Sequence, residues 1–279
     1  MSSRKSIRSG EGFRRAAGVA LVAVSLSCAI SQQQEVELGS EYAAQLASEL
    51  PVVKDPEITR YLTNLGNRIA KVADTRGLQW HFTVVDSREV NAFAVPGGWI
   101  YVNRGLIERA ENMSQLAGVI GHEIGHVTRR HSVQQMQQAQ GANAGVTVLC
   151  TLTKVCESGT GQTAINLGGT ALFAKFSRSD EAEADEEAVK TTIAAGIDPT
   201  GIPEMFEILR DARGRDPSAL DAFFATHPLE EDRIARTREL IAARPAAERR
   251  NLQKDDQQFQ AFRKRLQGLP APPAVARNP

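Results

Sequence analysis

The hydrophobic and polar positions follow a helical period in the first part of the chain. After Asp55-Pro56, apolar residues recur every three or four positions, at Ile58, Leu62, Leu65 and Ile69. Asp is a good helix cap because its carboxylate accepts hydrogen bonds from free backbone N–H groups, and Pro fits the first helical position. Residues 35–50 also have a helical composition. We therefore predict two helices in this part of the chain, the second of them packed into the core.

The period then changes to one that is typical of strands. Residues 80–85 are rich in β-forming side chains, and two further segments of this kind, 91–95 and 99–102, flank the turn sequence Pro96-Gly97-Gly98. This arrangement predicts a small antiparallel sheet.

A long helix is predicted after Asn112, which can cap it, since Gln115 follows three residues later as in a capping box. Its broad apolar surface contains Leu116, Val119, Ile120, Ile124 and Val127. Its interior glycines are Gly118, Gly121 and Gly125. Each interior glycine costs about 0.5–1 kcal/mol relative to Ala, so tertiary packing should hold this helix. The missing side chains would let another backbone or a metal site approach closely.

In the remaining chain we predict a loop or lid over residues 135–170 and helices over about 167–195, 202–213 and 229–243. Gly196 is expected to end the first of these helices, because glycine is frequent just after a helix C-terminus. The predicted fold class is α+β and mainly helical, with the small antiparallel sheet packed beside the helix that follows Asn112.

That helix carries the sequence His122-Glu123-Ile124-Gly125-His126. Positions i and i+4 share a helix face, so the two imidazoles can bind one metal ion while Glu123 points toward the remaining coordination position. The chain has five histidines in all, which makes a chance match rare. The pattern indicates a zinc peptidase site with His122 and His126 as ligands and Glu123 as the catalytic base. The alternative is a pair of core histidines.

A catalytic zinc ion normally has three protein ligands and a water molecule. The third-histidine extension of the metzincins is missing, because His131 stands at the wrong spacing. We expect His131, like His81, to have a structural role only.

An acidic segment at residues 177–185 supplies the missing carboxylate. Glu181 and Asp185 lie at i and i+4, so Glu181 could bind the metal while Asp185 orients a ligand imidazole by accepting a hydrogen bond. Glu183 is the alternative ligand. The alternative for the whole segment is a solvated helix face.

Together these motifs resemble the gluzincin-type zinc metallopeptidase family that contains HtpX, BepA and the CAAX prenyl proteases. The resemblance covers roughly residues 35–243 and is closest to the exported, lipoprotein-like bacterial members. Besides the two metal-binding segments, it rests on Asn91-Ala92-Phe93-Ala94 with its following turn, and on Thr226-His227-Pro228 with Arg233-Ile234.

The resemblance implies one Zn²⁺ per chain and an endopeptidase mechanism in which Glu123 takes a proton from water and passes it to the leaving amine. It also implies that His227 either donates to the developing oxyanion or binds zinc in a resting state. The alternative for His227 is a turn histidine before Pro228.

We expect a substrate to bind as an added β-strand beside Asn91, Ala92, Phe93 and Ala94, because main-chain hydrogen bonds recognise any unfolded chain. The alternative is that this segment is an interior strand.

Residues 1–28 are predicted to form an export signal. A basic start precedes an apolar run at residues 16–27, which is too short for the roughly 20 apolar residues of a membrane-spanning helix. Cys28 resembles the lipidated cysteine of a bacterial lipoprotein, although Ser25 stands where such signals usually have Leu. These features favour the bacterial cell envelope, in the periplasm or anchored to the outer membrane. Ordinary cleavage without lipidation is the alternative.

Charge and cysteine content add little more. The 33 basic and 33 acidic residues balance, so the chain lacks the excess of positive charge that is typical of nucleic-acid-binding proteins. Cys150 and Cys156 form either a disulfide or two separate thiols.

The expected domains are the signal over 1–28, a metallopeptidase domain over 29–245 and a helical, then Pro-rich tail over 246–279. The family resemblance implies the expected function, which is hydrolysis of unfolded or misassembled envelope proteins. The alternatives are a catalytically restrained or inactive zinc-bound chaperone or binding protein, and a structural zinc protein with His227 as fourth ligand.

Overall fold

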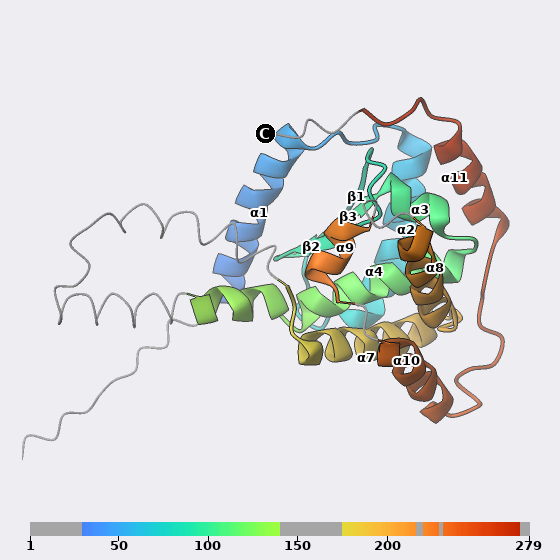
Figure 1. Ribbon diagram of the computed structural model, residues 1–279. Coiled ribbons are helices and arrows are strands. Elements are labelled where there is room, and N and C mark those ends of the chain that lie inside the picture. Colours follow the sequence, from blue (N-terminus) through green and yellow to red (C-terminus); the bar gives the residue numbers. More distant parts are fainter. Residues whose placement is uncertain (1–29, 140–174, 216–219, 229–230, 274–279) are drawn as a thin grey trace, which may run out of the picture.

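A computed structural model describes residues 30–139, 175–215, 220–228 and 231–273 of the chain (Figure 1). The elements before residue 130 are α1 (Gln32–Glu49), α2 (Pro56–Ala73), β1 (His81–Val85), β2 (Ala92–Val95), β3 (Trp99–Asn103), α3 (Arg104–Arg109) and α4 (Met113–Thr128). After them come a helical segment at 131–139, α7 (Arg178–Ala194), α8 (Gly201–Arg215), α9 (Asp221–Thr226), α10 (Glu231–Ala243) and α11 (Gln257–Gln267). The mainly helical α+β fold is confirmed.

Two helices begin where the sequence predicts a cap. The Asp55 side chain accepts hydrogen bonds from the backbone N–H groups of Glu57 and Ile58, which starts α2. The Asn112 side chain accepts a hydrogen bond from the N–H of Gln115, which starts α4. These bonds satisfy backbone donors that a helix N-terminus otherwise leaves without partners.

The sheet is mixed, with the strand order β1-β3-β2. β2 and β3 form the predicted antiparallel hairpin around Pro96-Gly97-Gly98, and both glycines of this turn have positive φ angles. β1, however, pairs in parallel with β3, so the expectation of a purely antiparallel sheet is wrong for this strand. The pairing of β1 is decided by how α2 and the following chain place it, which strand composition does not reveal.

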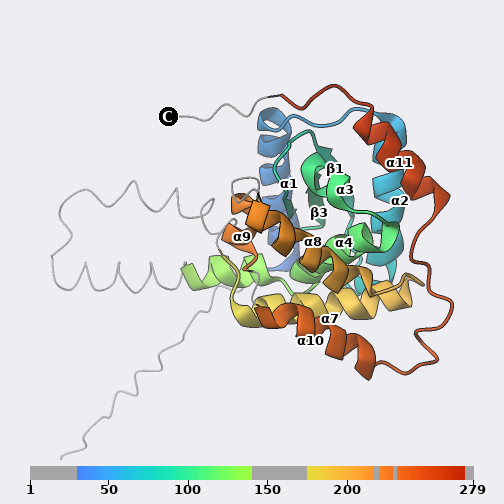
Figure 2. The same cartoon turned by 45° about the vertical axis from the view of Figure 1, so that its right-hand side comes forward.

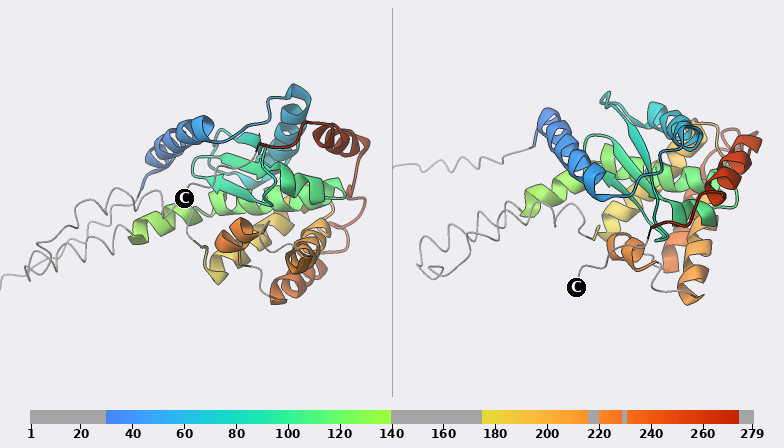
Figure 3. Two further views of the ribbon diagram at one scale, coloured as in Figure 1. Left: turned by 45° about the horizontal axis from the view of Figure 1, so that its top comes forward. Right: turned by 90° about the horizontal axis from the view of Figure 1, so that it is seen from above.

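Helix α4 lies at the centre of the molecule between two layers. The sheet and α2 pack on one side of it, and α7 and α8 pack on the other, as the tilted view in Figure 3 shows. In Figure 2, α10 lies along α7, and α11 lies against α2. The main apolar core joins α2, α4, the sheet, α8 and α11. Helix α4, which carries His122 and His126, is therefore surrounded by other elements.

Two predicted segment boundaries need correction. The helix expected from residue 167 begins instead at Arg178, because Ser177 and Asp180 form a capping box there, and residues 175–177 are not helical. The loop expected from residue 135 is helical over its described part, residues 135–139. The rest of that expected loop, with Cys150 and Cys156, and the segment with Cys28 lie outside the described residues.

Helix α1 packs on the face of the sheet opposite α4 and close to the β2–β3 turn. Its apolar side chains contact Val95 and Tyr101 of the sheet. At Gly39, α1 approaches the backbone so closely that a Cβ atom would overlap with the carbonyl group of Pro96. A glycine is therefore required where α1 crosses the hairpin turn.

This contact yields a stability prediction. Gly39→Ala should destabilise the protein by about 1–3 kcal/mol, since a well-packed contact must open to admit the methyl group. The matched control is Gly214→Ala in α8, where a Cβ atom would meet no neighbour within 4 Å. The control should be neutral or more stable by about 0.5–1 kcal/mol, because Ala favours a helix over Gly. Chemical denaturation of both variants measures the difference, and equal stability would contradict the assignment of this contact.

Candidate metal centre

The candidate centre forms where α4 and α7 approach each other closely. A Cβ atom at Gly121 would lie 3.4 Å from the Cα of Ala188, and one at Gly125 would lie 3.1 Å from the Cα of Ala184. Small residues therefore face each other along this contact. The close approach brings the acidic N-terminal part of α7 beside His122 and His126 of α4.

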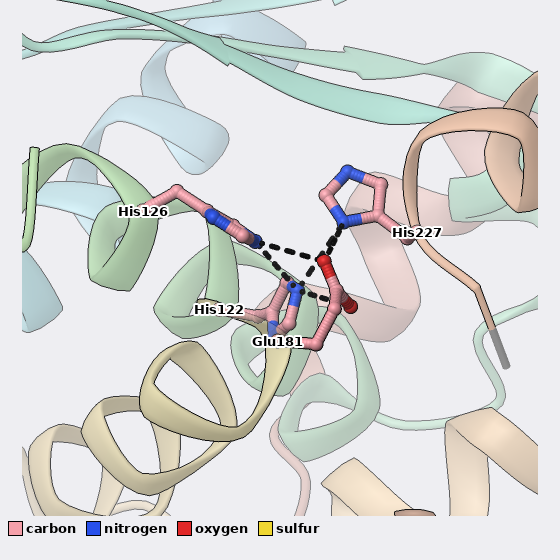
Figure 4. A group of neighbouring side chains, drawn as sticks. All are labelled: His122, His126, Glu181 and His227. Atoms are coloured by element: carbon pink, nitrogen blue, oxygen red, sulfur yellow. Dashed lines mark hydrogen bonds and ion pairs between the residues drawn. The ribbon is translucent and has the colours of Figure 1, made fainter. Parts of the chain in front are cut away.

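Four side chains from three parts of the chain converge on one point (Figure 4). They are His122 and His126 of α4, Glu181 of α7 and His227, which follows α9. One donor atom from each lies within 4.8 Å of the others, and all four side chains are buried.

Four of the distances between the donor atoms are close to those of a tetrahedral metal site. His126 Nε2 lies 3.0 Å from His122 Nε2 and 3.3 Å from Glu181 Oε1. His227 Nδ1 lies 3.4 Å from His122 Nε2 and 3.0 Å from Glu181 Oε1. Ligands about 2.0–2.1 Å from a tetrahedral zinc ion would be about 3.3 Å apart. Two or three imidazoles with one carboxylate are also a donor set that zinc prefers, so these residues fit the metal.

Glu123 lies next to this point but is not one of the four donors. Its side chain is 1% exposed, and among the described residues neither of its carboxylate oxygens has a hydrogen-bond partner. Its Oε1 lies 3.6 Å from His227 Nε2. Burial raises the pKa of the Glu123 carboxyl, although His227 and His122 act in the opposite direction. A carboxylate with a raised pKa and free lone pairs is suited to take a proton.

Asp185 lies one helical turn after Glu181 and faces the other ring nitrogen of His122. Its Oδ1 is 2.9 Å from His122 Nδ1, within reach of a charge-assisted hydrogen bond. Glu183, the alternative ligand, points elsewhere. Its side chain is half exposed, and its carboxylate lies 3.6 Å from His131.

Arg233 of α10 is the counter-charge of the two buried carboxylates. Its guanidinium group donates hydrogen bonds to both oxygens of Asp185 at 3.0 and 2.7 Å, and its Nη1 lies 2.6 Å from Glu181 Oε2. It is 1% exposed and packs over the ring of Phe206. In the sequence, Arg233 stands out only as part of a family motif, because nothing in the local pattern reveals which carboxylates it contacts.

The charges determine which donors are protonated. Burial alone would lower the pKa of His122, but the carboxylates of Glu181 and Asp185 raise it to about 10. Burial lowers the pKa of His126 well below its ordinary value. Burial would raise the pKa of Glu181, but His227 and His122 hold it well below the usual range. Glu181 is therefore an anionic donor and His126 a neutral one, as metal ligation requires, whereas His122 must release a proton when it binds the metal.

His131, for which only a structural role was expected, lies beside the donors. Its Nδ1 is 2.9 Å from His126 Nδ1, and Phe176 stacks on the His126 ring at 3.9 Å between centroids. Sequence spacing could not show this contact, since a helix continued through residue 131 would place the side chain on another face. His81, by contrast, stacks on Trp99 of the sheet and is not among the donors.

The segment proposed for substrate binding lies at an edge of the sheet. β2 contains Ala92, Phe93 and Ala94, and Asn91 immediately precedes it. In the described sheet β2 is an outer strand, paired with β3, and it packs against α4.

Comparison with known proteins identifies the class. The sequence profile of Peptidase family M48 matches residues 56–241, which is more than half of the chain. The chain therefore belongs to peptidase family M48, and its resemblance to the zinc metallopeptidase family of BepA is confirmed.

Individual relatives support the same assignment. Beta-barrel assembly-enhancing protease of Escherichia coli (strain K12) is 33% identical over 221 residues, which cover 77% of this chain and 45% of that relative. Metalloprotease LoiP of the same strain is 29% identical over 216 residues, 77% of this chain and 83% of LoiP. Mitochondrial metalloendopeptidase OMA1 of Schizosaccharomyces pombe is 30% identical over 183 residues, 66% and 53% of the two chains. The chain spans less than half the length of the first of these relatives.

Among the helices in the described part of the chain, none is both long and apolar enough to cross a bilayer.

The buried charges generate a prediction about stability. Arg233→Met should destabilise the fold by about 3–5 kcal/mol, because it leaves two buried carboxylates without their counter-charge. The control is Arg236→Met on the same helix, where the partner Asp232 is largely exposed. The control should change stability by about 0.5 kcal/mol or less. Urea unfolding in the presence of a chelator measures both values without a contribution from metal binding. A small effect of Arg233→Met would show that the carboxylates are not held as charged groups.

Proposed function

We propose that this protein is a zinc-dependent endopeptidase in which His122, His126 and Glu181 bind the metal ion. The single observation that carries the proposal is the convergence of these buried donors on one point, beside the carboxylate of Glu123, which has no hydrogen-bond partner among the described residues. Membership of a peptidase family supports the reaction class. A protein that only bound zinc or a partner chain would have no use for Glu123 at this place.

The roles of the side chains follow from their positions. When bound, zinc supplies a Lewis acid that polarises the scissile carbonyl and makes a water molecule more acidic. Glu123 takes the proton from the attacking water and later passes it to the leaving amine. Asp185 and Arg233 keep His122 in one orientation, because the carboxylate faces its Nδ1 and the guanidinium fixes the carboxylate.

His227 gives the site a fourth donor, and a catalytic zinc site needs an open coordination position. We propose that the arrangement with His227 Nδ1 among the donors is a resting state, and that His227 moves away when substrate and water enter. In that open state its ring would be a donor for the developing oxyanion. The competing possibility is a closed structural zinc site, to which the four-donor geometry itself lends some support.

Substrate chains are proposed to extend the sheet at β2. The N–H of Asn103 donates to the carbonyl of Asn91 at 2.9 Å, so this pair is hydrogen-bonded. Hydrogen-bonded and non-hydrogen-bonded pairs alternate along an antiparallel ladder, and the register pairs Ala92 with Val102 and Ala94 with Ile100. The backbone groups of Ala92 and Ala94 therefore point away from β3. An extended substrate could pair with them without sequence selection.

The biological setting is a further part of the proposal. We propose that the chain is exported to the bacterial envelope by the signal at residues 1–28, followed by a peptidase domain over 29–245 and a C-terminal tail. Lipidation at Cys28 would anchor it to the outer membrane, facing the periplasm. Its substrates would be unfolded or misassembled envelope proteins, in line with the name of the beta-barrel assembly-enhancing relatives.

The ligand set is tested by metal content. His122→Ala, His126→Ala and Glu181→Ala should each lose zinc, because two remaining strong ligands do not retain it. Glu183→Ala is the matched control on α7 and should keep one zinc ion per chain. His227→Ala should also keep zinc, and loss of zinc from this variant would favour the closed structural site. Elemental analysis of dialysed, folded protein provides the counts.

The catalytic role of Glu123 is tested by Glu123→Gln. The amide has nearly the same shape but cannot accept the proton, so cleavage of an unfolded protein should fall by about 10²–10⁴-fold while zinc stays bound. Mass spectrometry of an unfolded protein mixture, incubated with each form, measures the products. Turnover within a few-fold of the unchanged protein would remove Glu123 from the mechanism.

Strand addition is tested at Ala94. Proline there removes an N–H that points away from β3, so cleavage should fall at least about tenfold while folding and zinc content persist. Ala94→Ser is the control, because it keeps the N–H and adds only a hydroxyl group. If the folded, zinc-loaded proline variant cleaves as well as the serine variant, substrate does not pair at this position. Loss of the fold would instead mean that the protein itself uses this N–H.

A further inference from the structure

His126 contacts a second buried histidine that the proposed mechanism does not use. His131 Nδ1 lies 2.9 Å from His126 Nδ1, and the side chains of both residues are 1% exposed. The two rings meet edge to face, and Phe176 lies against both of them. The contact therefore excludes water from the ring nitrogen of His126 that points away from the metal position.

A break in the helix makes this contact possible. In a continuous helix, five residues correspond to a rotation of about 500°, so His131 would lie about 140° away from His126. Instead α4 ends at Thr128, and Arg130 adopts a left-handed conformation with φ of 62° before the helical segment 131–139 begins. Arg130 is held there by its bonds to Glu35 Oε2 and to the carbonyl of Ile30, at 2.7 and 2.6 Å.

The proton positions follow from the geometry. His126 Nε2 faces the other donors, so this nitrogen must be unprotonated when it binds metal, and the proton of the neutral ring is on Nδ1. An N–H in a buried site needs an acceptor, and His131 Nδ1 is placed to be one. His131 must then carry its own proton on Nε2. That nitrogen has no hydrogen-bond partner among the described residues, and the nearest carboxylate oxygens of α7 lie 3.6 Å away on Glu183 and 4.0 Å away on Asp180.

We propose that His131 is a positioning residue for the metal site: its Nδ1 accepts the hydrogen bond from His126 Nδ1–H and fixes that ligand as the tautomer that binds zinc through Nε2. The proposal rests on the proposed zinc site. Under this proposal the two imidazole ligands have different hydrogen-bond partners. The carboxylate of Asp185 orients His122, and the neutral imidazole of His131 orients His126.

Two amide substitutions separate the hydrogen bond from simple packing. The side-chain oxygen of Asn can occupy nearly the position of the His Nδ1 atom, whereas the oxygen of Gln reaches the position of Nε2, which points away from His126. His131→Gln should weaken zinc binding by about 10–100-fold, the usual loss for a partner of a metal ligand. His131→Asn should bind zinc within a few-fold of the unchanged protein.

Zinc affinity is measured by competition with a chelator, and the visible spectrum of the Co²⁺-substituted protein reports ligand geometry. A changed Co²⁺ spectrum in His131→Gln alone, with the matching loss of zinc affinity, is the expected result. Equal affinities for all three proteins would overturn the proposal, and so would equal losses in both variants, which would assign His131 to packing. Failure of the unchanged protein to bind zinc would instead disprove the proposed function.

A measurement on the unchanged protein does not depend on whether the variants fold. In zinc-loaded protein with ¹⁵N-labelled histidine, nitrogen chemical shifts should show His131 with its proton on Nε2 and His126 with a slowly exchanging proton on Nδ1. A His131 proton on Nδ1 would overturn the proposal, because that nitrogen could not then accept the bond.

Discussion

The close contact between α4 and α7 is the constraint on which the rest of the site depends. Gly121 and Gly125 face Ala188 and Ala184, and side chains larger than these would separate the two helices. Because the helices approach so closely, a carboxylate from α7 reaches the imidazoles of α4 without leaving a buried gap. Gly118, Gly121 and Gly125 are unfavourable for an isolated helix. Packing against the sheet, α2, α7 and α8 stabilises α4 instead.

Burying the negatively charged Glu181 and Asp185 side chains is electrostatically unfavourable, and Arg233 reduces this cost. Two buried carboxylates would repel each other and favour protonation, which would make Glu181 a poor metal ligand. The guanidinium of Arg233 contacts both of them and lowers the pKa of Asp185, while His227 and His122 lower the pKa of Glu181. Arg233 also fixes Asp185 against His122, so one buried cation contacts one ligand and helps to orient another. Burial raises the pKa of the Glu123 carboxyl, which accepts no hydrogen bond from any described residue.

The N-terminal helix is connected to the metal centre through a short series of contacts. Glu35 of α1 is fully buried and binds Arg130, whose left-handed backbone ends α4 and turns His131 back toward His126. Such a conformation costs about 1–2 kcal/mol for a residue other than glycine, so it requires support from its surroundings. Helix α1 therefore does more than cover the sheet, since it stabilises the turn that places His131.

The sequence by itself determined the helical spacing of His122, Glu123 and His126, the i and i+4 spacing of Glu181 and Asp185, the caps of α2 and α4, and the β2–β3 hairpin. These features depend on residues a few positions apart, and local backbone geometry decides them. Only the tertiary structure decided the parallel pairing of β1, the start of α7, the contacts of Arg233 and the place of His131. Each of these depends on groups that are distant in the chain or on a break in helical periodicity, so the relevant energies arise from packing and charge pairing that no local pattern contains.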